Sequence, residues 1–347
     1  MKLSLNLGTY FGIPVNVHWS FSLLLVYVIF QSLAAGAGWQ STVLYVVLVL
    51  LIFVCVVLHE YGHALAARRY GVETKDITLL PIGGIARLER LPDLPKQELI
   101  VAIAGPLVNI IIAVVLMGFL LIMPNLGIPS MDALGELKLS LSNLPIILVG
   151  FNLIMVAFNL IPAFPMDGGR ILRSLLAMKF TKTVATKWAA HIGQFISVLF
   201  VIYGLYQGDY ILAFIGVFIF MSASREHKIV AHNAYMNETD LSSIMRNEFT
   251  ILNPNDNIPF ARNRIAGLRE NFFVVVDEND KIVGYVSKGA IENAESDQSV
   301  SNIISYLPTA LREHMSLAEV SSIFQIYRVP ILPVFREDKI IGVVELA

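Results

Sequence analysis

Long apolar runs dominate the first two thirds of the chain and predict membrane-spanning helices. A helix needs about 20 residues to cross a bilayer. Six stretches approach this length, near residues 18 to 37, 43 to 66, 99 to 123, 144 to 164, 188 to 206 and 209 to 224. The last is the shortest. The pattern therefore predicts an α-helical polytopic membrane domain with about six transmembrane helices.

A different pattern lies between residues 72 and 90. Ile77 and Leu79 alternate with polar residues, and Pro81 and the two glycines after Ile82 interrupt the run. Weak alternation around a Pro and Gly break is typical of a short β-hairpin. Strand backbone at membrane depth must be covered by protein or line a wet cavity. We expect a membrane-associated hairpin here, with an ordinary cytosolic loop as the alternative.

The last third of the chain is mixed in polarity and contains an internal repeat. FFVVVDENDKIVGYVS at 272 to 287 matches VPILPVFREDKIIGVVE at 329 to 345, with the turns at Asp280 and Asp338 offset by 58 residues. Each copy reads as a helix followed by two strands. We therefore expect a membrane domain over residues 1 to 230, a linker over 231 to 240, and a small soluble α/β domain over 241 to 347.

Composition agrees with a membrane protein. The chain is 56% hydrophobic and 15% charged, with a mean hydropathy of +0.67, which excludes a single soluble globular domain. A net charge of -2 without a dense basic stripe excludes nucleic acid as a partner. The single cysteine, Cys55, excludes an intrachain disulfide and is expected to be a small buried hydrophobe.

Basic residues are unevenly distributed between the predicted spans. The loops after the first, third and fifth predicted spans contain a single basic residue, Lys138. For the first span, a cleaved signal peptide is the alternative. The positive-inside rule predicts six crossings, both termini in the cytosol and a cytosolic tail from about Arg225. We expect the cell membrane of a prokaryote as the location. Two groups of basic side chains follow the second and fourth spans, including Arg170 and Arg173 as expected anchors at the cytosolic interface: Arg68, Arg69, Lys75, Arg87, Arg90 and Lys96, then Arg170, Arg173, Lys179, Lys182 and Lys187.

An HExxH motif ends the second span, at His59, Glu60 and His63. Residues four apart share one helix face, so two imidazoles can bind one Zn²⁺ while the neighbouring Glu acts on water. The sixteen residues before the motif are wholly apolar, and ionisable groups at such depth are costly without partners. This placement favours a metal site over a solvated helix face.

A catalytic zinc site needs a third protein ligand. Asp167 follows the fourth span, which runs in the same direction as the second, so both motifs lie toward the same membrane face. Pro162 and Pro165 should end the helix before Asp167, and Gly168 with the next glycine permits a tight turn. Proline-broken spans also mark ion or substrate sites in transporters. His191, in the fifth span, is left open between a functional and a packing role.

These motifs together resemble the site-2 protease family of intramembrane zinc metalloproteases over about residues 8 to 227. The matching segments are GIPVNVHWSF at 12, HEYGH at 59, LLPIGGIARLE at 79, AGPLVN at 104 and NLIPAFPMDGG at 159. The resemblance implies a zinc-dependent endopeptidase with one Zn²⁺ per chain. It implies His59, His63 and Asp167 as ligands, Glu60 as general base, and regulated cleavage within or near a transmembrane segment of a membrane-protein substrate.

The resemblance also implies that the hairpin pairs with the substrate as an added strand. The expected substrate-binding residues are Pro81, Ile82, Gly83, Gly84, Asn159 and Pro165. For Asn159, helix packing is the alternative. Asn109 and Asn152 are expected to be helix-contact residues, and Gly105 to allow close approach of helices.

The tail repeat resembles a tandem pair of cystathionine-β-synthase (CBS) domains, as in the compact branch of the family. Such pairs often bind adenine nucleotides, but Ser287 is followed by Lys288, Gly289 and Ala290 instead of the expected acid. The second copy is truncated at Ala347. Nucleotide binding is therefore one hypothesis, and a structural or dimerising module, with a homodimer, is the other.

Two further readings compete with a protease. A transporter or channel with a regulatory CBS tail would explain the broken fourth helix, but not a Glu inside a two-His helical site. A catalytically inactive scaffold would ordinarily lack a ligand or the Glu, and neither is missing at residues 59 to 63.

Overall fold

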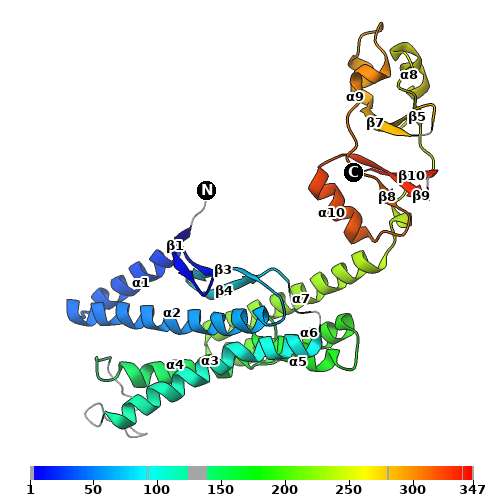
Figure 1. Ribbon diagram of the computed structural model, residues 1–347. Coiled ribbons are helices and arrows are strands. Elements are labelled where there is room, and N and C mark those ends of the chain that lie inside the picture. Colours follow the sequence, from blue (N-terminus) through cyan, green and yellow to red (C-terminus); the bar gives the residue numbers. More distant parts are fainter. Residues whose placement is uncertain are drawn as a thin grey trace. The chain divides into compact units, whose positions relative to one another are not determined.

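The structure is a computed structural model that describes residues 4–90, 92, 94–123, 139–279, 281–337 and 339–345. Its contacts divide the chain into two compact units, Met1–Val230 and Ala231–Ala347 (Figure 1). Lys138, Asp280 and Asp338, which entered the predictions above, lie outside the described residues.

The first unit is mainly helical. Among the described residues, three helices are long and apolar enough to cross a membrane, namely α2, α3 and α6, while α1 and α4 are apolar but have only 14 and 16 residues. The predicted helical membrane domain is confirmed, and six crossings stay a prediction. The helices are α1 Phe21–Ala34, α2 Trp39–Arg68, α3 Pro95–Ile122, α4 Leu144–Asn159, α5 Asp167–Ala177, α6 Lys182–Gln207 and α7 Tyr210–Glu238.

A sheet accompanies these helices. In the described residues its order is β1-β2-β3-β4, with β2 and β3 parallel and the outer pairs antiparallel. The predicted hairpin is confirmed as β3 with β4, whereas the first hairpin, β1 with β2, was not expected. The strands are β1 Ser4–Tyr10, β2 Ile13–His18, β3 Thr74–Leu80 and β4 Gly83–Leu88.

Helix α2 occupies the middle of this unit, with the sheet along one side and α3 along the other (Figure 1). On the sheet side, Ile13 and Ile77 pack against Tyr61 and Ala64. On the other side, a Cβ added at Gly62 would lie 2.7 Å from the Ala104 carbonyl oxygen, so a side chain would force α2 and α3 apart. The sheet and α3 thus fix both faces of the helix that carries the HExxH motif.

Arg173 is not the interfacial anchor that the charge pattern predicted. Its side chain is completely buried, Nε donates to Glu98 Oε1 at 2.8 Å, and Nη1 donates to Glu226 Oε1 at 2.5 Å. The guanidinium carbon also lies 5.1 Å from the ring centre of Phe164. The prediction is wrong because acids from α3 and α7 provide partners for the charge inside the protein. Arg170, by contrast, is half-buried.

The second unit contains two similar copies of an α/β motif. In the described residues, β5, β6 and β7 form one three-stranded sheet and β8, β9 and β10 form the other. Each copy reads strand, helix, strand, strand, which confirms the predicted repeat. The elements are η3 Leu241–Ser243, β5 Ile251–Leu252, α8 Ile258–Ile265, β6 Phe272–Val276, β7 Ile282–Ser287, α9 Lys288–Asn293, η4 Val300–Ile303, β8 Leu311–Arg312, α10 Leu317–Tyr327, β9 Ile331–Arg336 and β10 Lys339–Glu345.

Candidate metal centre

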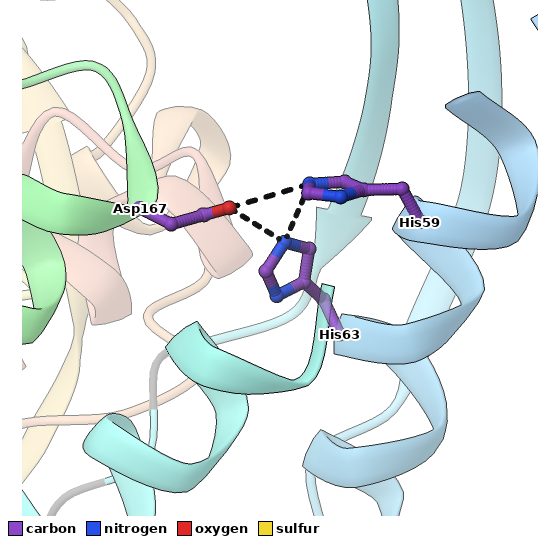
Figure 2. Close-up of side chains that lie close together, drawn as sticks. All are labelled: His59, His63 and Asp167. Carbon is purple, nitrogen blue, oxygen red and sulfur yellow. Dashed lines mark hydrogen bonds and ion pairs between the residues drawn. The ribbon is translucent and has the colours of Figure 1, made fainter. Parts of the chain in front are cut away.

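Three buried side chains from α2 and α5 converge on one point (Figure 2). His63 Nε2 lies 3.1 Å from both His59 Nε2 and Asp167 Oδ2, and His59 Nε2 lies 3.3 Å from the same carboxylate oxygen. Each residue is only 4 to 6% exposed. The arrangement brings the two motifs together, although His63 and Asp167 are 104 positions apart.

Hydrogen bonds fix the tautomers of both imidazoles. His63 Nδ1 donates to the Val101 carbonyl at 2.7 Å, so its Nε2 carries the lone pair. His59 Nδ1 contacts Asn109 Oδ1 at 2.5 Å. That oxygen is the acceptor because Asn109 Nδ2 donates to Asn152 Oδ1 at 2.7 Å, and Asn152 Nδ2 donates to the Leu148 carbonyl at 2.8 Å. Both Nε2 lone pairs therefore face Asp167.

Asp167 reaches this point because α4 ends early. The helix stops at Asn159, three residues before Pro162, and α5 begins at Asp167 itself. The N-terminus of a helix favours a negative charge. Gly168 does not form the expected turn but lies in α5, where a Cβ would be 2.2 Å from the Ile161 carbonyl oxygen. Its missing side chain allows the broken segment to fold back on α5.

Gly105 of α3 packs directly against the two imidazoles of the group. A Cβ at this position would lie 2.2 Å from His63 Nε2 and 2.8 Å from His59 Cε1. The close approach expected at Gly105 is therefore between the backbone of α3 and the imidazoles of His59 and His63. No larger residue fits without moving the rings.

The residues present fit a zinc ion. Three atoms with lone pairs face one another inside the protein, and the Nδ1 protons of both rings are already used elsewhere, an arrangement that a bound cation would stabilise. Zinc bonds of about 2.0 to 2.1 Å in a tetrahedron place ligand atoms about 3.3 Å apart, close to the observed separations of 3.1 to 3.3 Å. Two nitrogens and one carboxylate oxygen are ligands that zinc accepts, with a fourth position open.

Glu60 lies beside this group on the side of α2 that faces the sheet. It is half-buried, and its Oε2 accepts the backbone N–H of Ala86 in β4 at 3.2 Å. Successive helix residues are about 100° apart, so Glu60 adjoins the His59 face without joining the ligand triangle. Its carboxylate is not part of the ligand group, so it is available to act as a general base.

The other predicted residues are divided between two places. Pro81 and Ile82 form the β3–β4 turn, with Ile82 87% exposed, and the glycines that follow begin β4. Asn159 ends α4 and is half-buried, whereas Pro165 is exposed in the segment before α5. The predicted substrate residues thus belong to two segments, the β3–β4 hairpin and the end of α4 with the segment before α5, and their role stays a prediction.

Sequence reasoning missed the role of Asn109, and it left His191 open between a functional and a packing role. Asn109 and Asn152 were expected to be helix-contact residues, and their hydrogen bond does join α3 to α4; what was not expected is that they form a completely buried amide relay behind His59. The signal available was an Asn in an apolar helix, which indicates a partner without naming it. His191 lies on α6 with its ring 6.5 Å from that of His227, and it does not belong to the described ligand group.

Comparisons with known proteins find similar sequences over most of the chain. A family model described as Peptidase family M50 matches residues 47–144 and 127–204, and a CBS domain model matches residues 241–297. The chain is 36% identical over 299 residues to the zinc metalloprotease MJ0392 of Methanocaldococcus jannaschii, which covers 85% of this chain and 81% of the relative. The solved site-2 protease from Methanocaldococcus jannaschii is 38% identical, with a TM-score of 0.47, and the match covers 65% of this chain and 95% of that one.

A solved CBS domain of a bacterial CNNM/CorC family Mg²⁺ transporter in complex with ATP also matches, at 18% identity and a TM-score of 0.32, over 35% of this chain and 91% of that one. The extended match to MJ0392 decides the family. The chain belongs to peptidase family M50, the site-2 type of zinc metalloprotease, and carries a C-terminal CBS domain.

Proposed function

We propose that the chain hydrolyses a peptide bond within or near a transmembrane segment of a membrane-protein substrate, in regulated intramembrane proteolysis. His59, His63 and Asp167 hold one zinc ion per chain in this proposal, and Glu60 is the general base. The observation that carries it is the buried ligand triangle at the end of an apolar helix. A site at this position is accessible to a substrate that is itself embedded in the membrane.

Each side chain has a separate task in the proposed reaction. When bound, zinc supplies Lewis-acid polarisation of the scissile carbonyl and acidifies a water molecule. Glu60 takes a proton from the attacking water at its carboxylate and later gives it to the leaving amine. Val101 and Asn109 hold the two imidazoles in the ligating tautomer by accepting their Nδ1 protons.

The substrate must be locally unwound, because a helical peptide bond is masked by its own hydrogen bonds. We propose that the unwound segment adds to the free edge of β4 as a strand, near Gly83 and Gly84. Pro81 and Ile82 at the turn, with Asn159 and Pro165 on the other side, complete the substrate site. The exposed Ile82 offers an apolar contact for such a segment.

Replacing Glu60 with Gln tests the mechanism. Cleavage of a membrane peptide in proteoliposomes should be abolished while zinc content, measured by mass spectrometry, stays near that of the parent. Glu73→Gln, at an exposed Glu before β3, is the matched control and should cleave normally. If Glu60→Gln cut as fast as the parent, the assigned role would be refuted.

The remaining proposals concern organisation. We propose residues 1 to 230 as the protease domain, 231 to 240 as the linker and 241 to 347 as the CBS region, with both termini in the cytosol. Charge asymmetry in the sequence supports this topology. Maleimide labelling of a cysteine introduced in the CBS region should require permeabilised cells, and labelling of intact cells would reverse the topology.

Adenine-nucleotide binding is proposed for the CBS region on the strength of the CBS family match alone. The Ser287 hydroxyl caps α9 by accepting the backbone N–H of Ala290, and none of the next three residues is acidic. Calorimetry of the full chain with ATP, ADP and AMP tests this proposal. Absence of heat with all three would leave the structural or dimerising role.

A further inference from the structure

The outer edge of β4 meets the proposed general base. Among the described residues, β4 pairs with β3 and with no other strand, so its second edge presents unpaired backbone groups. The strand lies directly against α2, because a Cβ added at Gly84 would be 3.0 Å from Glu60 Cγ and from Val56 Cγ1. This contact places the carboxylate of Glu60 within reach of that edge.

One backbone donor on this edge is already engaged. The N–H of Ala86 donates to Glu60 Oε2 at 3.2 Å, so it points away from β3. Backbone groups in an antiparallel strand alternate between the two edges. Ala86 is paired with Ile77, and Gly84, two positions earlier, with Leu79. The backbone groups of Gly84 and Ala86 therefore face the same free edge.

A substrate strand and Glu60 need the same donor. A strand that adds to this edge uses its carbonyl oxygens to accept the outward N–H groups of β4. One N–H makes one strong hydrogen bond. Pairing at Ala86 therefore requires Glu60 to leave, and a carboxylate that has left the strand is free to turn toward the metal position.

We propose that Ala86 is a positioning residue whose backbone N–H holds Glu60 on the edge of β4 in the free enzyme and releases it when a substrate strand pairs there. The inference rests on the proposed function, which takes Glu60 as the general base and β4 as the substrate edge. The proposal predicts that the enzyme discriminates between substrates by the length of their extended segment. An extended membrane-protein segment long enough to pair with β4 activates its own hydrolysis, whereas a short peptide leaves the base restrained.

The test removes this one donor. Ala86→Pro deletes the N–H at a site where proline is tolerated, since the donor faces away from the paired strand. Glu73→Gln, at an exposed position before β3 and away from this donor, is the control. Two substrates are compared, a long membrane peptide and a short peptide that spans only the scissile bond.

Opposite effects on the two substrates are expected. Ala86→Pro should raise kcat for the short peptide about tenfold, the effect of releasing one hydrogen bond to a charged group. It should raise KM for the long peptide about twofold to tenfold, the effect of losing one neutral hydrogen bond. Glu73→Gln should behave as the parent. A fall in activity on both substrates, or no change on either, would overturn the proposal.

Amide hydrogen exchange of the full-length protein keeps the proposal testable if the proline variant does not fold. Without substrate, the Ala86 amide should exchange about tenfold faster in Glu60→Ala than in the parent, because its acceptor is gone. Glu60→Gln keeps an acceptor oxygen and should exchange slowly. Equal exchange in Glu60→Ala and the parent would overturn the proposal. This measurement needs no activity, so its failure is separate from failure of the proposed protease mechanism.

Discussion

Replacing Asn109 with alanine removes the acceptor that sets the orientation of His59. The side chains of His59 and Asn109 are joined at 2.5 Å in a region where neither residue is more than 4% exposed, so bulk water has little access to the group that loses its partner. A buried N–H left without an acceptor costs about 1–3 kcal/mol. The ring is also free to move its proton to Nε2, which cannot then bind a metal ion.

The expected loss is about tenfold to 100-fold in zinc affinity, the range found when a group that orients a metal ligand is removed. The relay predicts a graded series. Asn152→Ala keeps the direct bond to His59 and removes only the group behind it, so its loss should be smaller. Ser32→Ala removes another buried interhelical hydrogen bond, to Thr42 at 2.9 Å, about 25 Å along α2 from His59. It should leave zinc affinity unchanged.

Zinc affinity can be measured in detergent by competition with a chromophoric chelator, and thermal unfolding of the zinc-free protein reports stability separately. All three variants should be less stable than the parent, and only the two relay variants should bind zinc more weakly. Parental zinc affinity in Asn109→Ala would refute the relay. A larger loss in Asn152→Ala than in Asn109→Ala would refute its order.

Three other predictions concern packing and charge. Gly105→Ala places a methyl group 2.2 Å from the His63 Nε2 position and should lower zinc occupancy at least about tenfold by the loss of ligand geometry; normal occupancy by metal analysis would contradict the packing described. Arg173→Leu leaves the buried Glu98 unpaired and should lower the free energy of unfolding by about 3–5 kcal/mol, with part of the loss recovered when Glu98→Leu is added; strictly additive losses in thermal unfolding would contradict the ion pair. The hydrogen bond from Arg87 holds the pKa of Asp76 below its usual range, so its stabilisation is present at neutral pH and is lost as the pH falls through that lowered pKa. Asp76→Asn should therefore lower the Tm only slightly at pH 7, because water surrounds Arg87, whose side chain is 63% exposed, and this difference should shrink in acid; an equal deficit at pH 3 would contradict it.

Local patterns predicted those features that depend on neighbouring residues. The helix around residues 43 to 66 is observed as Trp39–Arg68, and the break before Asp167 follows from Pro162, which cannot continue a helix. Because the second and fourth predicted spans run in the same direction, the sequence also predicted that Asp167 lies near the histidines. Their assignment as zinc ligands nevertheless stays a proposal.

Features that depend on distant partners were missed. Arg173 looked like an interfacial anchor because its acidic partners are 75 and 53 positions away in the chain. Asn109 is 50 positions from His59, and an Asn in an apolar helix does not show which helix it faces. The β1–β2 hairpin was missed because Gly8 and Gly12 interrupt the alternation, and both have the positive φ angles that favour glycine.

The order of the proposed ligands along the chain has a consequence for biosynthesis. The two histidines precede Asp167 by at least 104 positions. At about 5–20 residues per second, the ribosome needs about 5–20 s to make that interval. During this time α2 already carries a His pair and Glu60, but the carboxylate that completes the group does not yet exist. A nascent protease is thus without a full metal site while it is inserted beside other new membrane proteins, and activity begins only after its later helices are made.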